Sequence, residues 1–251
     1  MTRVPPSPQR GEGWGEGATQ EQTDLLKHVL APIHKDGWRF IAIFAVVALI
    51  LLWLWAPLGW LGAVATLWCI YFFRDPWRVS PQRAGLVLSP ADGLIIAVGD
   101  APPPPELGLG SEPMQRIAIF MSVFDVHVNR APMAGRVARL AYTEGKFLNA
   151  SLDKASLDNE RMAIRLSTAE GDIGVTQIAG LVARRIVSTL REGEEVIAGQ
   201  RIGLIRFGSR AEVFLPRGWA VLAIAGQRAV GGETVLADAR AQEPPRRGAE
   251  H

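Results

Sequence analysis

The sequence is poor in cysteine and lysine. Its 251 residues include a single cysteine, Cys69, which allows neither an internal disulfide nor a cysteine-based metal cluster, and we expect no bound metal. Only four of the 27 basic residues are lysines, and none lies beyond Lys154. Biotinyl and lipoyl carriers attach their cofactor to a lysine on a hairpin. The glycine-containing turns at 192–200 resemble those hairpins, but without a lysine a carrier role is disfavoured.

Charge is missing from one long stretch. No charged residue occurs in the 34 positions from Phe40 to Phe73. A single helix of this length would measure about 50 Å at ~1.5 Å per residue, whereas the hydrocarbon core of a bilayer is roughly 30 Å thick. The central Pro57-Leu58-Gly59 predicts a break and therefore a hydrophobic helical hairpin. We assign residues 23–78 to a membrane-associated helical segment, which is too long to be a signal peptide core.

Basic residues flank both outer ends of this segment, while its central turn has none. Lys35 and Arg39 precede it, and Arg74 and Arg78 follow it. The positive-inside rule then places both ends in the cytoplasm. We expect an inner-membrane protein with its remaining domain on the cytoplasmic face. A spanning hairpin and a re-entrant wedge are both compatible with this pattern.

The rest of the chain is mainly β in character. Residues 1–22 and 241–251 show no apolar periodicity, and we expect both to be disordered. Short apolar runs separated by Gly, Pro and Asp fill residues 79–240 and predict an antiparallel sandwich or barrel with lipoyl-like hairpins. The ten expected strands cover 85–88, 93–98, 116–121, 135–141, 162–167, 172–178, 182–186, 201–207, 212–215 and 220–225.

Two stretches in this domain carry candidate acid–base residues. Asp92 lies in Ser89-Pro90-Ala91-Asp92-Gly93, a turn that leads into a strand, and a plain turn aspartate is the alternative. His127 lies in the 124–132 stretch. Two of the other three histidines, His28 and His34, precede the uncharged stretch and His251 ends the chain, so His127 is the one imidazole expected in the folded domain. The alternative is a packed, hydrogen-bonded histidine.

A Gly-Ser pair interrupts the runs 201–207 and 211–215. Glycine lacks Cβ, so Gly208 permits conformations in which the Ser209 hydroxyl reaches the preceding carbonyl, as backbone self-cleavage requires. A bulge or bend is the simpler interpretation of such a pair.

Taken together, the motifs around Asp92, His127 and Ser209 resemble the short bacterial form of the phosphatidylserine decarboxylase family. The order and spacing agree over roughly residues 35–235, including Phe72-Phe73-Arg74-Asp75-Pro76. The resemblance implies a proenzyme that cleaves itself between Gly208 and Ser209. Ser209 would become a covalent pyruvoyl cofactor that forms a Schiff base with the substrate amine. Phosphatidylserine would then yield phosphatidylethanolamine and CO2.

The resemblance also implies roles for particular residues. His127 would be the base and Asp92 would orient it, whereas Arg130 occupies the second position of the long form's His-x-x-His pair. On charge and position alone, three arginines are candidates for binding phosphate and carboxylate: Arg130, Arg184 and Arg185. The expected partners are a membrane phospholipid and the chain's own two fragments, held as a heterodimer. A higher oligomer is left open, and no nucleic acid is expected.

Two other interpretations remain at this point. A membrane-anchored, lipoyl-like adaptor without catalysis would stay uncut and would be indifferent to Ser209→Ala. A pyruvoyl decarboxylase for a related amino-phospholipid would share every motif. The sequence does not distinguish it from a decarboxylase that acts on phosphatidylserine.

Overall fold

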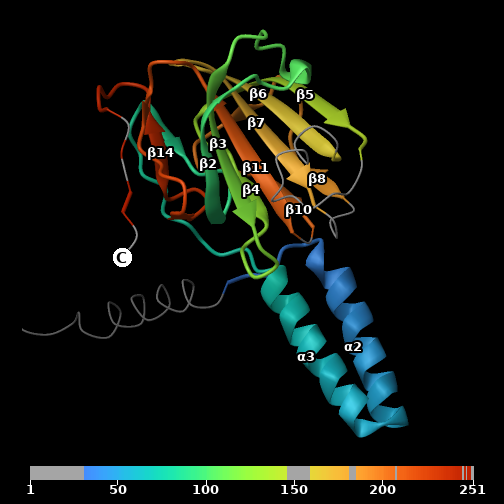
Figure 1. The fold of residues 1–251 in the computed structure, drawn as a ribbon. Helices are drawn as coiled ribbons and strands as arrows, with labels where there is room; N and C mark the ends of the chain where they lie inside the picture. The colour runs from blue at the N-terminus through green and yellow to red at the C-terminus, as the bar shows by residue number, and fades with distance from the viewer. Residues whose placement is uncertain are drawn as a thin grey trace, which may run out of the picture.

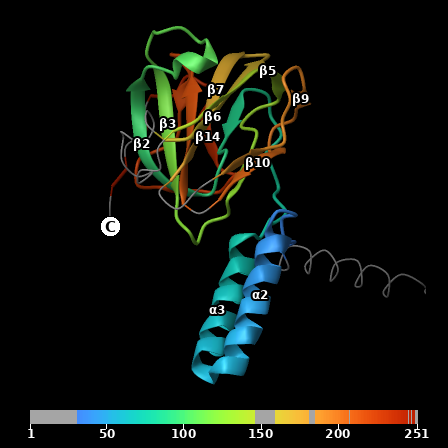
Figure 2. The same ribbon diagram turned by 90° about the vertical axis from the view of Figure 1, so that its right-hand side faces the viewer.

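The computed structural model describes residues 31–145, 159–180, 185–206, 208–244, 246 and 248–249. It consists of a pair of apolar helices that extends from one end of a β-rich domain (Figures 1 and 2). The prediction of disorder for 1–22 lies outside the described residues, as do most of the expected strand 182–186 and part of the tail 241–251.

The helices are α2, Gly37–Leu54, and α3, Ala56–Phe72, and they confirm the predicted hairpin. The break falls at Trp55, which has extended backbone angles, and not at Pro57. Pro57 instead lies in the first turn of α3, where a missing backbone N–H costs no helical hydrogen bond. Gly59 serves packing, because a Cβ there would lie 2.3 Å from the Cα of Leu52 on α2.

The outer surface of the helix pair is apolar. α2 is long and apolar enough to cross a membrane, and α3 is a slightly shorter apolar helix. Trp53 and Trp60, near the tip of the hairpin, are 85% and 70% exposed. A contiguous exposed apolar surface of this kind is typical of contact with lipid.

The β domain is antiparallel, as predicted, and contains three sheets. The largest has eight strands in the order β13-β2-β3-β11-β7-β6-β5-β9, and the two three-stranded sheets have the orders β1-β14-β12 and β4-β10-β8. The strands are β1 Leu86–Leu88, β2 Gly93–Ala101, β3 Met114–Met121, β4 Val128–Arg130, β5 Gly135–Thr143, β6 Arg161–Thr168, β7 Gly171–Ala179, β8 Ile186–Ser188, β9 Glu195–Val196, β10 Arg201–Ile205, β11 Ser209–Leu215, β12 Ala220–Val221, β13 Arg228–Ala229 and β14 Val235–Asp238, with a 3-10 turn η1 at Pro105–Leu107.

Strand β11 lies in the middle of the large sheet. It pairs with β3 on one side and with β7 on the other, and all seven of its residues are buried. Strand β10 belongs to a different sheet and pairs with β4 and β8. The chain therefore passes from one sheet to another at the Gly-Ser bond.

The helix pair and the β domain share a small apolar cluster. Phe72 and Phe73 at the end of α3 are fully buried there, together with Val126, Val128 and Leu204 from the β domain. The two ends of the hairpin are also joined, because the His34 amide donates to the Phe73 carbonyl at 2.8 Å. The end of α3 is thus packed directly against the segment that carries His127.

Candidate active site

Gly208 has a backbone conformation that favours glycine. Its φ is +66°, in the left-handed region, and a Cβ would have no neighbour closer than Val123 Cγ1 at 3.9 Å. The requirement for glycine here therefore comes from the backbone angle and not from crowding.

Ser209 follows as the first residue of β11 and is fully buried. Its partners across the sheet are Met121 on β3 and Ala179 on β7. The Ser209 hydroxyl lies 3.6 Å from the sulfur of Met121. The serine is therefore buried between two apolar strand neighbours.

His127 lies directly beside this bond. Its Nε2 accepts a hydrogen bond from the Gly208 backbone N–H at 3.2 Å, and its Nδ1 lies 3.0 Å from the backbone oxygen of Asp125. A carbonyl can only accept, so Nδ1 carries the proton and Nε2 presents a lone pair. The structure thus brings His127, Gly208 and Ser209 together.

Burial keeps this imidazole neutral. The ring stacks at a tilt on Phe72, with 4.3 Å between ring centroids, and is fully buried. Loss of solvation lowers the pKa of His127 from 6.5 to about 4. At neutral pH the side chain can accept a proton at Nε2.

The loop before His127 is fixed by a carboxylate that sequence reasoning did not single out. Asp125 accepts hydrogen bonds from the Ser122 amide and hydroxyl, each at 2.8 Å, and forms an ion pair with Arg228 on β13. The Asp125 carbonyl is thereby held where it meets Nδ1 of His127. The position of Asp125, two residues before His127, is the feature of the sequence that could have indicated this contact.

Asp92 makes other contacts than those predicted. Its carboxylate forms an ion pair with Arg78 at 2.6 Å and accepts a hydrogen bond from the Gly231 amide at 2.7 Å. Burial raises the pKa of the Asp92 carboxyl, although Arg78 opposes this shift. Nδ1 of His127 contacts the Asp125 carbonyl and not Asp92, so no direct contact supports the expected orienting role of Asp92. Asp92 instead fixes the 231 turn and the segment that follows α3.

Comparison with known proteins identifies the family of this chain. The family profile described as phosphatidylserine decarboxylase matches residues 65–237. The chain belongs to the phosphatidylserine decarboxylase family. Three curated relatives carry the name phosphatidylserine decarboxylase proenzyme. The protein of Paramagnetospirillum magneticum is 55% identical over 93% of this chain and 98% of its own length. That of Beijerinckia indica is 57% identical over 87% and 94%, and that of Cereibacter sphaeroides is 55% identical over 90% and 98%.

In this family member Arg130 is tied to the protein itself. Its guanidinium donates to the Gly199 oxygen at 2.9 Å and to the Pro76 oxygen at 3.0 Å, and it lies 3.5 Å from Asp75. The side chain is only 8% exposed. These contacts join the segment after α3 to the β domain and leave little of Arg130 for a substrate.

Arg185 lines a basic pocket at the base of the hairpin. The pocket has a volume of about 500 Å³ and lies between the start of α2 and strand β8. Arg39 and Arg206, which sequence reasoning did not select, also line it, and Asp36 contributes a carboxylate. The guanidinium of Arg206 lies 5.0 Å from the centre of the Phe40 ring, and its Nε is buried without a partner among the described residues. Arg184 lies outside the described residues.

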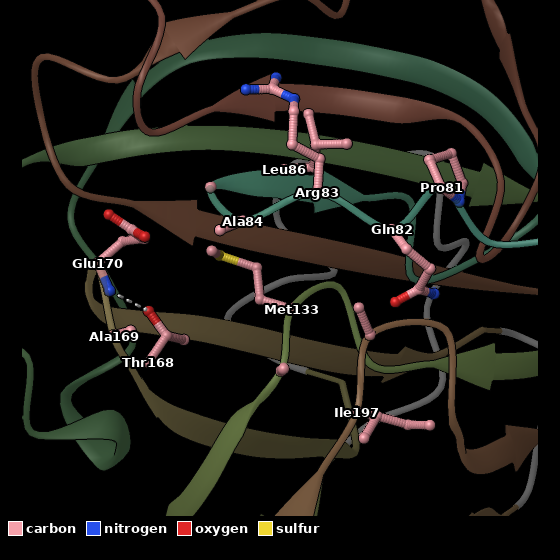
Figure 3. Close-up of a pocket in the computed structure, with 13 residues that line it drawn as sticks. Pro81, Gln82, Arg83, Ala84, Leu86, Met133, Thr168, Ala169, Glu170 and Ile197 are labelled. Carbon is pink, nitrogen blue, oxygen red and sulfur yellow. Dashed lines mark hydrogen bonds between the residues drawn. The ribbon is translucent and has the colours of Figure 1, made fainter.

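A second pocket lies in the β domain beside strand β1. It has a volume of about 360 Å³, and Figure 3 shows Leu86, Met133 and Ile197 around it, with Arg83 and Glu170 at its edges. None of the predicted site residues lines it. Among the described residues, no group of three or more His, Cys, Asp or Glu is placed to hold a metal ion.

Proposed function

We propose that this chain is a self-processing proenzyme that cuts itself between Gly208 and Ser209 and then decarboxylates phosphatidylserine. The observation that carries the proposal is the neutral imidazole of His127, whose Nε2 lone pair meets the Gly208 amide one residue before a buried serine. The relatives' name, phosphatidylserine decarboxylase proenzyme, supports both halves of it.

Cleavage needs no group from outside the chain except water. The Ser209 hydroxyl attacks the Gly208 carbonyl and its proton passes to His127, while the peptide C–N bond breaks and the nitrogen is protonated. The resulting ester then loses the Ser209 α-proton, and the Gly208 carboxylate leaves. Water converts the remaining dehydroalanine to a ketone and releases ammonia. The chain ends as residues 1–208 and 209–251.

Residue 209 is a suitable place for a pyruvoyl group. It is fully buried, and its neighbours Met121 and Ala179 are apolar. Once formed, the group would supply a ketone that condenses with the substrate amine and accepts the electron pair left as CO2 departs. The chain's part is to exclude water and to hold a neutral imidazole nearby, because a low-dielectric site favours loss of charge from a carboxylate.

The helix pair supports a lipid substrate. Its exposed apolar surface fits a bilayer, and the basic residues on both sides of the uncharged stretch support a cytoplasmic position of the β domain at the inner membrane. We place the phosphate of the headgroup in the basic pocket, with Arg39, Arg185 and Arg206 as its donors. Arg184 is one residue from this pocket in sequence and remains a candidate. A phospholipid could then be bound without leaving the membrane.

The two fragments would remain a heterodimer. The smaller one begins with β11, which pairs along its length with β3 and β7 of the larger fragment. β13 pairs with β2, and β14 with β1, so four ladders join the fragments. Removal of one backbone bond leaves these contacts in place.

The proposal is tested with purified protein in detergent and vesicles of phosphatidylserine. We expect phosphatidylethanolamine and CO2 from the unaltered protein and neither from Ser209→Ala, which stays uncut. Ser167→Ala, at an exposed serine of β6, is the control and retains activity. If the unaltered protein remains uncut and inactive, the result would support the alternative of a membrane-anchored adaptor without catalysis. Conversion of another amino-phospholipid in preference to phosphatidylserine would support the second alternative.

A further inference from the structure

Two side-chain amides, Asn129 and Gln177, are fully buried beside Ser209. Gln177 on β7 pairs with Ala211, and Ala179 two residues further pairs with Ser209. Residues two apart on a strand share a face of the sheet, so Gln177 is a diagonal neighbour of Ser209 on the same face, roughly 7–8 Å away between Cα atoms. The remaining residues of that face around it are apolar.

The hydrogen bonds of Asn129 fix the orientation of its amide. The Pro90 carbonyl can only accept, and the Asn129 Nδ2 lies 3.4 Å from it and 3.6 Å from the sulfur of Met121. The amide nitrogen therefore faces these two acceptors, and Oδ1 faces Gln177.

This orientation in turn fixes Gln177. Its Nε2 donates to the Asn129 Oδ1 at 2.7 Å. Its Oε1 is then an acceptor, and it is buried without a hydrogen-bond partner among the described residues. An unpaired buried acceptor lowers folding stability, so a purely structural role explains the Nε2 contact and leaves Oε1 unexplained.

We propose that Gln177 Oε1 accepts an N–H of the substrate amine when that amine reaches residue 209. The headgroup of phosphatidylserine has three charged groups, and its phosphate and carboxylate are acceptors only. The amine alone supplies N–H donors. Gln177 is thus a substrate-contacting residue, and Asn129 is the positioning residue that holds its amide. This inference rests on the proposed function.

The test measures capture of an amine without turnover. Processed protein is incubated with phosphatidylethanolamine and cyanoborohydride, and the mass gained by the 209–251 fragment is followed against lipid concentration. Gln177→Met keeps the length of the side chain and removes both hydrogen-bonding atoms. We expect complete self-cleavage but a half-saturating lipid concentration raised on the order of ten- to a hundredfold, as for a lost hydrogen bond to a charged group.

The matched control is Thr176→Val. Thr176 is the preceding residue of β7, is fully buried, and also has an unpartnered oxygen among the described residues, but it lies on the opposite face of the sheet. This variant should capture the lipid like the unaltered protein. Equal capture by Gln177→Met and the unaltered protein would overturn the proposal.

Gln177→Glu keeps the inference testable if Gln177→Met does not fold. If the introduced carboxyl group contacts the amine, its protonation state changes how well the amine is captured, and the pH profile of capture gains an additional ionisation. If it does not contact the amine, the pH profile is unchanged. An unchanged pH profile would contradict the proposal. Failure of the proposed function is distinguishable, because the unaltered protein would then remain uncut and gain no mass.

Discussion

At the scale of single residues, Gly208 has the most demanding backbone conformation of the site. An alanine at φ +66° costs about 1–2 kcal/mol, and open space around the missing Cβ removes any steric contribution. Gly208→Ala should therefore populate the reactive geometry less often and cleave itself roughly tenfold more slowly. The cleavage rate is measured by intact mass at intervals after cell-free synthesis.

Gly226→Ala is the control for this prediction. Gly226 has φ +93° and a Cβ there would have no neighbour within 4 Å, so an alanine carries a similar backbone penalty in a different turn. It should lower stability and leave the cleavage rate unchanged. Equal rates for Gly208→Ala and the unaltered protein would show that this conformation is not needed for cleavage.

The pKa of His127 gives a pH prediction with a definite sign. Because burial lowers the pKa from 6.5 to about 4, the imidazole remains neutral as the pH falls from 7 to about 5. The self-cleavage rate should be constant over that range and should fall about tenfold per pH unit below pH 4. A precursor made by cell-free synthesis and shifted into buffers of graded pH provides the measurement. A decline that begins near pH 6.5 would indicate a solvated histidine.

The structure brings three of the predicted residues together, but their contacts could not be predicted from the sequence. Elimination among four histidines led to His127, and the Gly-Ser pair led to Gly208 and Ser209. The hydrogen-bond partner of His127 Nδ1, the Asp125 backbone oxygen, could not be predicted. Every residue has a backbone oxygen, so the sequence does not indicate which one is used. Asp92 was given that role because its motif shares a site with His127 in the resemblance, and its contact with Arg78 depends on how the chain returns from α3.

At the scale of elements, the end of α3 packs against His127. Phe72 is fully buried, and its ring lies 4.3 Å from that of His127. Phe72→Ala would leave a cavity beside the imidazole and cost about 3–5 kcal/mol of stability. We expect cleavage to slow at least tenfold even where the protein remains folded, as judged by circular dichroism and intact mass. Trp60→Ala, at the exposed tip of the hairpin, should affect neither.

The elements themselves were largely predictable. Absence of charge from Phe40 to Phe73 predicted the hairpin, and short apolar runs separated by Gly, Pro and Asp predicted most strands. The break was misplaced by two residues because proline is acceptable in the first turn of a helix. Strand β4 was missed because its three residues, Val128–Arg130, include a polar amide and a cation. The neighbours of β11 were not predictable, since they join segments far apart in the chain.

At the scale of the whole molecule, the hairpin and the basic pocket together define how a lipid would approach. The pocket adjoins the start of α2, where the apolar surface of the hairpin ends. Arg206→Gln should raise the KM for phosphatidylserine in vesicles about tenfold with little change in self-cleavage, because it removes a charged donor to the phosphate. Arg217→Gln, in the exposed turn after β11, is the control. A KM equal to that of the unaltered protein would place the phosphate elsewhere.

Self-cleavage of the backbone is the central claim, and the intact mass of the purified protein tests it most directly. We expect two chains, one ending at Gly208 and one beginning at residue 209, the second lighter by one ammonia than a chain that begins with serine. They should co-elute without denaturant and separate in guanidinium chloride, because β11 lies between β3 and β7. A single continuous chain of 251 residues in the active protein would contradict the account.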